Sequence, residues 1–148
     1  MKKEYFVLWG CITFFSIGCM SHTKEKVPSL IQEATPQEAF LWEPFGMHIV
    51  NENPDRHRVI YVSADWCLTC VDFEQRVLLD SVVREKMGAK NVIAMRADMT
   101  KEDEEIASLL LSYNENILPV LIYIPAEGTG VSFSKHITKE AFLAVLAE

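Results

Sequence analysis

Three short apolar runs limit what this chain of 148 residues can fold into. They cover residues 59–62, 92–95 and 120–124. A continuous apolar run of this length is typical of a strand that is buried on both faces. The first two runs are separated by residues 67–88, which carry apolar side chains at helical spacing. Strands that alternate with helices predict an α/β domain with a parallel sheet.

Helix-capping residues divide the rest of the chain into further elements. The expected helices are residues 35 to about 45 with Thr35 as cap, 67–78, 80–88 with Asp80 as cap, one capped by Thr100 with Asp103, and one capped by Thr138. The last two carry apolar residues on one face, namely Ile106, Leu109, Leu110 and Tyr113, and then Phe142, Val145 and Leu146. Residues 51–57 are expected to be loop. A turn at 125–130 and a fourth strand at 131–134 are expected to close the sheet with a hairpin.

The composition excludes some classes of function. The net charge of −7 leaves no basic stripe of the kind that nucleic-acid binding requires. The sequence has no internal repeat and no glycine-rich loop that could hold a phosphate group. A chain of this length is large enough to bury a core without disulfide staples.

The first twenty residues have the layout of a secretory signal. Lys2 and Lys3 precede an uncharged stretch, Tyr5–Ile17, which is shorter than the roughly 20 apolar residues of a membrane span. The segment that ends at Cys19 is similar to a lipobox, so we expect Cys19 to be lipidated. Cleavage near Ser21 and an uncleaved N-terminal anchor are the alternatives. The expected location is the periplasm, with the membrane contacted only through a lipid anchor.

We therefore expect three parts, a signal peptide at 1–20, a polar tether at 21–34 and a folded domain at 35–148. Cys11 leaves with the signal peptide, and Cys19 is lipidated or removed. Cys67 and Cys70 are then the cysteines of the folded domain, and a single pair does not make a disulfide framework.

Cys67 and Cys70 follow the first apolar run and open the next helix, at the strand end where sites form in open α/β sheets. The unpaired N–H groups of a helix N-terminus favour an anion, so we expect the pKa of Cys67 to lie below the usual value of about 8.5. Cys70 lies one turn later on the same helix face. The pair is predicted to be an exposed nucleophile, Cys67, and a shielded resolving thiol, Cys70, which together carry out thiol–disulfide exchange.

Three alternative roles for the cysteine pair fit the sequence less well. Two buried structural thiols, or a chance occurrence of the spacing, would not need this position. A zinc site needs four ligands, or three and a water, and His48, His57 and His136 are scattered without a second cysteine pair. Covalent haem needs a histidine after the second cysteine, where Val71 stands. We expect no metal, and no cofactor other than the redox-active disulfide itself.

Pro119 follows Leu118 at the start of the third apolar run. A cis bond between them would turn the backbone outward, where it can pair with an extended substrate strand beside the cysteines. We expect this bond to be cis, with a trans proline that marks a strand start as the alternative. Trp66, Leu118 and Pro119 are then expected to form an apolar rim suited to extended protein segments.

The motif Trp66-Cys67-Leu68-Thr69-Cys70, the order of strands and helices, and Ile117-Leu118-Pro119 together resemble the thioredoxin superfamily. "YVSADWCLTCVDFE" is similar to the A-D-W-C-x-x-C-x-x-F-E signature of the C-terminal periplasmic domain of the thiol reductase DsbD. The resemblance covers about Val59 to Leu146. It implies a thioredoxin-like fold, in which helices flank a central mixed sheet of about four strands and the CxxC begins the helix after the first core strand.

The resemblance also implies roles for individual residues. Cys67 would be the attacking thiol, Cys70 the resolving thiol and Pro119 the cis-proline. Glu74 matches a glutamate that lies near the cysteines in that family and influences their protonation, and a solvated helix carboxylate is the alternative for it.

The sequence departs from the family at two positions and in its length. Tyr61 stands where a buried aspartate is usual, and Val71 stands where a lysine commonly follows the motif. Proton transfer at Cys70 would then depend on Glu74 or on water. Since no membrane electron-transfer domain is attached, we expect a stand-alone periplasmic oxidoreductase of the DsbH kind.

The expected function is therefore that of an enzyme, a thiol–disulfide oxidoreductase that acts as a reductant or isomerase. Its expected partners are cysteine-containing secreted or periplasmic proteins and a membrane electron donor of the DsbD or CcdA type. An oxidase-type disulfide donor is one alternative, and a non-catalytic binding module or a copper chaperone is another. Copper-delivery relatives usually separate their cysteines by three residues and add a histidine, whereas two residues intervene here.

Overall fold

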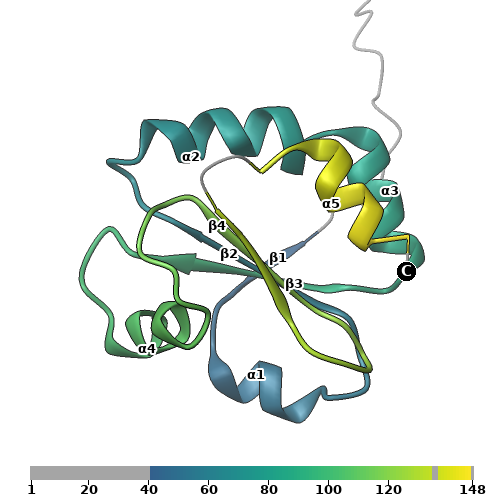
Figure 1. Ribbon diagram of the computed structural model, residues 1–148, viewed down its shortest axis with the longest axis horizontal. Helices are drawn as coiled ribbons and strands as arrows, with labels where there is room; N and C mark the ends of the chain where they lie inside the picture. The colour runs from purple at the N-terminus through teal and green to yellow at the C-terminus, as the bar shows by residue number, and fades with distance from the viewer. Residues whose placement is uncertain (1–40, 135–136, 148) are drawn as a thin grey trace, which may run out of the picture. The chain divides into compact units, whose positions relative to one another are not determined.

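The computed structural model describes residues 41–134 and 137–147, which all belong to one unit of the chain, residues 36–148. Five strands form a mixed sheet in the order β1-β3-β2-β4-β5 (Figure 1). Their bounds are β1 Trp42–Pro44, β2 Arg58–Ser63, β3 Ile93–Asp98, β4 Val120–Ile124 and β5 Val131–Ser134. Strands β1, β3 and β2 run parallel to each other, whereas β4 is antiparallel to β2 and β5 is antiparallel to β4.

Helices cover both faces of this sheet (Figure 1). On one face lie α2 Leu68–Phe73, its π-helical continuation η1 Glu74–Leu78, α3 Ser81–Ala89 and α5 Lys139–Val145, and on the other lie α1 Met47–Glu52 and α4 Glu104–Ser112. The side chains of Asp80 and Thr138 accept hydrogen bonds from the first turns of α3 and α5, as the sequence predicts.

The burial of β2 explains why its sequence is apolar without interruption. Val59 and Tyr61 belong to the core cluster beneath α2, α3 and α5, whereas Ile60 and Val62 belong to the cluster beneath α1 and α4. All four side chains are fully buried. The sheet therefore separates two cores, and the strand that passes between them has no solvent-facing position in its centre.

The helix predicted from residue 35 to about residue 45 is wrong in its described part. Residues 42–44 form strand β1, which pairs in parallel with β3 at the edge of the sheet. The Trp42 ring meets the Tyr61 ring edge-on, with 6.1 Å between the ring centroids. Pairing at a sheet edge and the aromatic contact of Trp42 contribute to holding this segment, and neither leaves a periodic pattern in three residues. The predicted cap Thr35 lies outside the described residues.

Three smaller expectations also need correction. The expected mixed sheet and the β4–β5 hairpin are confirmed, with five strands in place of about four. The parallel direction expected for the third apolar run is wrong, since β4 is antiparallel to its neighbour β2, because an apolar run predicts burial and not direction. Helix α1 extends to Glu52, into the stretch predicted as loop. Helix α4 is capped by Asp103 and not by Thr100, since the Asp103 carboxylate accepts the N–H groups of Glu105 and Ile106.

Within residues 41–134 and 137–147, no helix is long and apolar enough to span a membrane. The predicted signal peptide at 1–20, its Cys19 and the polar tether at 21–34 lie outside the described residues.

Candidate active site

Cys67 and Cys70 form a disulfide where β2 passes into α2. Strand β2 ends at Ser63, and the Cys67 N–H donates to the Ala64 carbonyl at 3.0 Å, which closes a tight turn. Cys67 is the N-cap of α2 and Cys70 lies in its first turn, with 5.2 Å between their Cα atoms. The disulfide therefore lies at the carboxyl ends of the parallel strands, as the sequence predicts.

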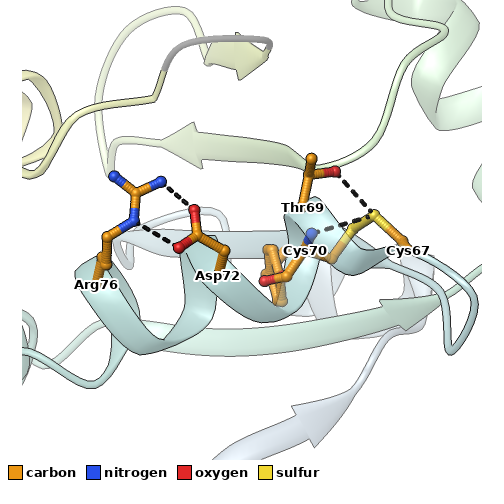
Figure 2. A network of polar contacts seen from close by, with 6 residues as sticks. Cys67, Thr69, Cys70, Asp72 and Arg76 are labelled. Atoms are coloured by element: carbon orange, nitrogen blue, oxygen red, sulfur yellow. Dashed lines mark hydrogen bonds and ion pairs between the residues drawn. A yellow bond between two sulfur atoms is a disulfide. The ribbon is translucent and has the colours of Figure 1, made fainter.

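Two hydrogen-bond donors point at the sulfur of Cys67 (Figure 2). The Cys70 backbone N–H donates to Cys67 Sγ at 3.2 Å, and Thr69 Oγ1 lies 3.4 Å from the same sulfur. A disulfide sulfur carries no hydrogen, so the Thr69 hydroxyl is the donor. Donors placed in this way stabilise negative charge on sulfur, and the surroundings of Cys67 therefore suit a thiolate after reduction.

Both cysteines are buried in this oxidised form, Cys67 with 5% and Cys70 with 2% of its surface exposed. The prediction of an exposed Cys67 is therefore wrong for this state, because the turn packs Cys67 into the core cluster beneath α2. The residues on either side of it are exposed instead, Trp66 at 65% and Leu68 at 83%. The buried Cys67 is thus flanked in the chain by two exposed apolar residues.

Leu118 and Pro119 lie at the same edge of the sheet. Val120 at the start of β4 pairs with Val62 near the end of β2, which places the preceding residues beside the cysteine turn. The Leu118–Pro119 peptide bond is cis, which confirms the prediction. Leu118 packs against the cluster that contains both cysteines, and Pro119 is buried. A role in substrate binding for these two residues and Trp66 stays a prediction.

Thr100 holds the turn that carries Cys67 by a hydrogen bond, a role that its sequence position does not predict. Its Oγ1 accepts the Asp65 N–H at 2.9 Å and donates to Asp98 Oδ1, which also accepts the Thr100 N–H at 2.8 Å. These two bonds, the hydroxyl bond first, hold the pKa of Asp98 below its usual range. A charged Asp98 orients the hydroxyl towards the Asp65 N–H, and the N-cap position of α4 is occupied by Asp103.

Tyr61 occupies the position where the resemblance implies a buried aspartate. Its side chain is fully buried, and its hydroxyl donates to the Cys70 carbonyl oxygen at 2.8 Å. Burial raises the pKa of Tyr61, and the charge of Glu74 raises it further. The phenol is therefore a neutral donor at physiological pH and not a proton acceptor. Its ring packs against Phe73 of α2, with 5.5 Å between the centroids.

Glu74 lies one turn after Cys70, where α2 passes into η1, and it forms an ion pair with Arg96 of β3. The Arg96 guanidinium also lies over the Tyr61 ring, 5.6 Å from its centroid. Glu74 is thus a paired, partly covered carboxylate and not a freely solvated one, while its influence on the cysteines stays a prediction. An arginine that interrupts the apolar residues of β3 is the sequence signal that could have identified Arg96.

Within the part of the chain that the structure describes, no three His, Cys, Asp or Glu side chains converge as metal ligands. His57, one of the scattered histidines, lies just before β2, at the end away from the cysteines. Its Nδ1 is 2.7 Å from the Tyr123 hydroxyl, and it belongs to a different part of the domain from the disulfide.

Known protein sequences that are similar to this chain include a thioredoxin-like family and the DsbD proteins. Residues 55–126 match the family described as thioredoxin-like. The thiol:disulfide interchange protein DsbD of Haemophilus ducreyi is 31% identical over 86 residues, which cover 56% of this chain and 15% of that protein. The chain spans only 12% to 15% of the length of such curated DsbD relatives, so the likeness concerns one part of a longer protein.

Comparison with solved structures supports the fold. The oxidised C-terminal domain of DsbD from Neisseria meningitidis superposes with a TM-score of 0.56 at 17% identity, over 72% of this chain and 97% of that domain. The DsbH oxidoreductase superposes with a TM-score of 0.50 at 18% identity, over 72% of this chain and 81% of that protein. At such identities the likeness shows a shared thioredoxin-like fold.

Proposed function

We propose, because the chain carries a thioredoxin-like domain with a CxxC disulfide, that it is a thiol–disulfide oxidoreductase that exchanges disulfides with protein partners through Cys67 and Cys70. The observation that carries the proposal is the environment of the disulfide. Cys67 caps α2, and its sulfur accepts hydrogen bonds from the Cys70 N–H and the Thr69 hydroxyl. A purely structural bridge has no need of donors that favour its reduced, anionic form.

In the reducing direction, the Cys67 thiolate donates an electron pair to one sulfur of a partner's disulfide. A mixed disulfide forms, the partner's S–S bond breaks, and the leaving sulfur takes up a proton. Cys70 then loses its proton to solvent and attacks Cys67 Sγ, which forms the Cys67–Cys70 bond and releases the second partner thiol. The partner gains two electrons and two protons, and the dithiol has lost them.

The positions of the two cysteines support the roles that we propose for them. Cys67 is the N-cap of α2, whereas Cys70 lies within the first turn of the helix and has 2% of its surface exposed. Their Cα separation of 5.2 Å lets the resolving sulfur reach the mixed disulfide with little backbone movement. We therefore propose Cys67 as the attacking thiol and Cys70 as the resolving thiol.

The direction that we propose is reduction or isomerisation of partner disulfides, by analogy with the DsbD relatives. The partners would be cysteine-containing secreted or periplasmic proteins, and a membrane thiol donor would re-reduce the domain. The periplasmic location and the lipid anchor at Cys19 rest on the sequence pattern of residues 1–20. Labelling with a fatty acid in cells that express the wild type or Cys19→Ser tests the anchor, since the label should be lost in the variant.

Trapping of a mixed disulfide tests the exchange itself. The Cys70→Ser variant keeps the attacking sulfur but cannot resolve the intermediate, so it should accumulate a covalent adduct with a disulfide-bonded protein substrate. The Cys67→Ser variant should trap nothing. If Cys70→Ser binds substrate without a covalent adduct, the domain is a passive binding module and the proposal is wrong.

Equilibration of the purified domain with glutathione redox buffers tests the direction. Known CxxC proteins range from about −270 mV for thioredoxin to about −120 mV for DsbA. A reductant should lie towards the thioredoxin side of that range, and an isomerase near the value of about −180 mV of protein disulfide isomerase. A value near −120 mV would instead assign the domain as a disulfide donor.

A further inference from the structure

We propose that the Thr69 hydroxyl is a catalytic group of this site, which donates a hydrogen bond to Cys67 Sγ and stabilises the thiolate that attacks the partner. The inference deepens the proposed thiol–disulfide exchange and rests on it. It assigns a function to a residue between the two cysteines that would otherwise be only a spacer.

The geometry that carries the proposal is a direct contact with the reacting atom (Figure 2). Thr69 Oγ1 is 3.4 Å from Cys67 Sγ, within hydrogen-bonding range for sulfur. The Cys70 N–H approaches the same sulfur at 3.2 Å. The sulfur is thus the shared acceptor of one backbone donor and one side-chain donor.

Helix α2 does not require the contact between the Thr69 hydroxyl and Cys67 Sγ in order to form. Thr69 lies in the first turn of α2, where its side chain could bond to the backbone, yet Cys67 Sγ is the partner that its hydroxyl has within the described residues. The Thr69 side chain is exposed, so burial does not select a threonine here. Threonine is also a weak helix former, so helix propensity does not favour it here either.

The chemistry of the contact follows from the charge on sulfur. In the disulfide the sulfur is a weak acceptor, whereas in the thiolate it carries a full negative charge and accepts the same hydrogen bond more strongly. Because Thr69 is β-branched, its hydroxyl occupies few rotamers and loses little freedom when the bond forms. The bond weakens again when the electron pair of the thiolate enters the new S–S bond with the partner.

Two measurable properties should therefore depend on the hydroxyl. A stabilised thiolate raises the fraction of Cys67 that is ionised near neutral pH. The same interaction stabilises the reduced form relative to the disulfide, which makes the domain more readily reduced. A residue that only shaped the turn would not shift both properties in step.

The test compares Thr69→Val, which removes the hydroxyl but keeps the shape, with Thr69→Ser, which keeps the hydroxyl. Val71→Thr is the matched control, because it exchanges the same two side chains at an exposed position after Cys70. Each variant is assayed for the pH at which alkylation of Cys67 reaches half its maximal rate, and for its equilibrium with glutathione. The thermal midpoint of the oxidised form is measured as a check on folding.

Thr69→Val should move the alkylation midpoint to higher pH. At a fixed glutathione ratio, it should lower the ratio of reduced to oxidised protein about three- to tenfold, which is the size expected when a partly exposed hydrogen bond to a charged acceptor is lost. A tenfold change corresponds to about 30 mV towards a more reducing potential. Thr69→Ser should stay near the wild type, and Val71→Thr should not differ from it. Should Thr69→Val fold poorly, Thr69→Ala against Thr69→Ser gives the same comparison.

Two results would overturn the inference. One is an unchanged alkylation midpoint and glutathione equilibrium in Thr69→Val, and the other is an equal change in Thr69→Ser, which retains the donor. Failure of the proposed function is recognised separately, since the wild type would then not exchange disulfides and its Cys70→Ser variant would trap no adduct.

Discussion

The two ends of strand β2 are held in different ways, although one strand connects them. At the start of the strand, the guanidinium of Arg58 donates to three backbone carbonyls, those of Val50, Pro54 and Pro125, at 3.0 to 3.3 Å. Arg58 is 6% exposed, so these bonds are shielded from water. This end of β2 fixes helix α1 and the β4–β5 turn to the sheet.

The other end of β2 carries the cysteine turn and is held by bonds near the surface. The Met99 N–H donates to the Ser63 carbonyl at 2.8 Å, and the Asp65 N–H donates to the Thr100 hydroxyl at 2.9 Å. Asp65 is exposed, and so is the neighbouring Trp66. The comparison distinguishes a scaffold end, where shielded side-chain bonds hold α1 and the β4–β5 turn, from a reactive end, where the cysteine turn is bonded near the surface and local opening should cost less free energy.

Removal of the Arg58 guanidinium should give the largest loss of stability. Arg58→Met keeps the apolar stem but leaves three carbonyls without their donor, which should lower the free energy of unfolding by about 3 kcal/mol. Denaturant unfolding of the oxidised protein measures it, and the glutathione equilibrium should stay unchanged. The control is Arg56→Met, whose guanidinium bonds Asn91 at the surface and should lose about 1 kcal/mol or less. Equal losses of unfolding free energy in the two variants would contradict the distinction between buried and surface hydrogen bonds.

Tyr61→Phe removes a buried hydrogen bond at the reactive end. The hydroxyl donates to the Cys70 carbonyl, which also accepts the Glu74 N–H, so one acceptor bond remains. We expect a loss of about 1 kcal/mol in the free energy of unfolding, measured with denaturant on the disulfide form. An unchanged free energy would mean that the carbonyl finds an equivalent partner without the phenol.

Thr100→Val should change kinetics more than stability. Because Asp65 is exposed, water replaces the lost acceptor, and the free energy of unfolding should fall by less than about 1 kcal/mol. The turn that carries Cys67 becomes less fixed, so the rate constant for attack on a model disulfide should fall severalfold. Thr100→Ser should restore the rate. A variant that retains the wild-type rate would show that the turn does not depend on this bond.

The smallest expected effect is a pH dependence at the scaffold end. Burial lowers the pKa of His57, and the nearby charges of Lys90 and Arg58 lower it further. As pH falls through about 6.5, the unfolded chain takes up a proton that the folded protein does not, so stability decreases until the folded imidazole is also protonated. The thermal midpoint of the wild type should drop between pH 7.5 and 5.5. His57→Gln should drop less, and an identical drop would assign the dependence to other groups.

Local patterns predicted the elements that local physics determines. The apolar run of β2, the cap at Asp80 and the position of Cys67 were all predictable, because burial on two faces and helix capping leave their marks within a few residues. Strand β1 was not predictable, because its three residues are held by an edge pairing with β3. The direction of β4 was not predictable either, since it depends on the path of the chain and not on the composition of the strand.

The residues of the candidate site also divide into those that the sequence predicts and those that depend on tertiary structure. The motif identifies the two cysteines, and the cis bond at Pro119 follows from its place in the fold. The supporting residues depend on tertiary register. Arg96 reaches Tyr61 and Glu74 because β3 pairs with β2 in one register, and Thr100 reaches Asp65 because the loop after β3 lies beside the turn. Neither contact can be read from sequence spacing.

Alkylation of the reduced domain across a pH series tests the central claim most directly, with the modified cysteine identified by peptide mapping. Since the N-cap position, the Cys70 N–H and the Thr69 hydroxyl all favour negative charge on Cys67, this residue should react first, with a midpoint below the value of about 8.5 for an ordinary cysteine. Initial modification of Cys70, or a Cys67 midpoint at or above 8.5, would contradict the account.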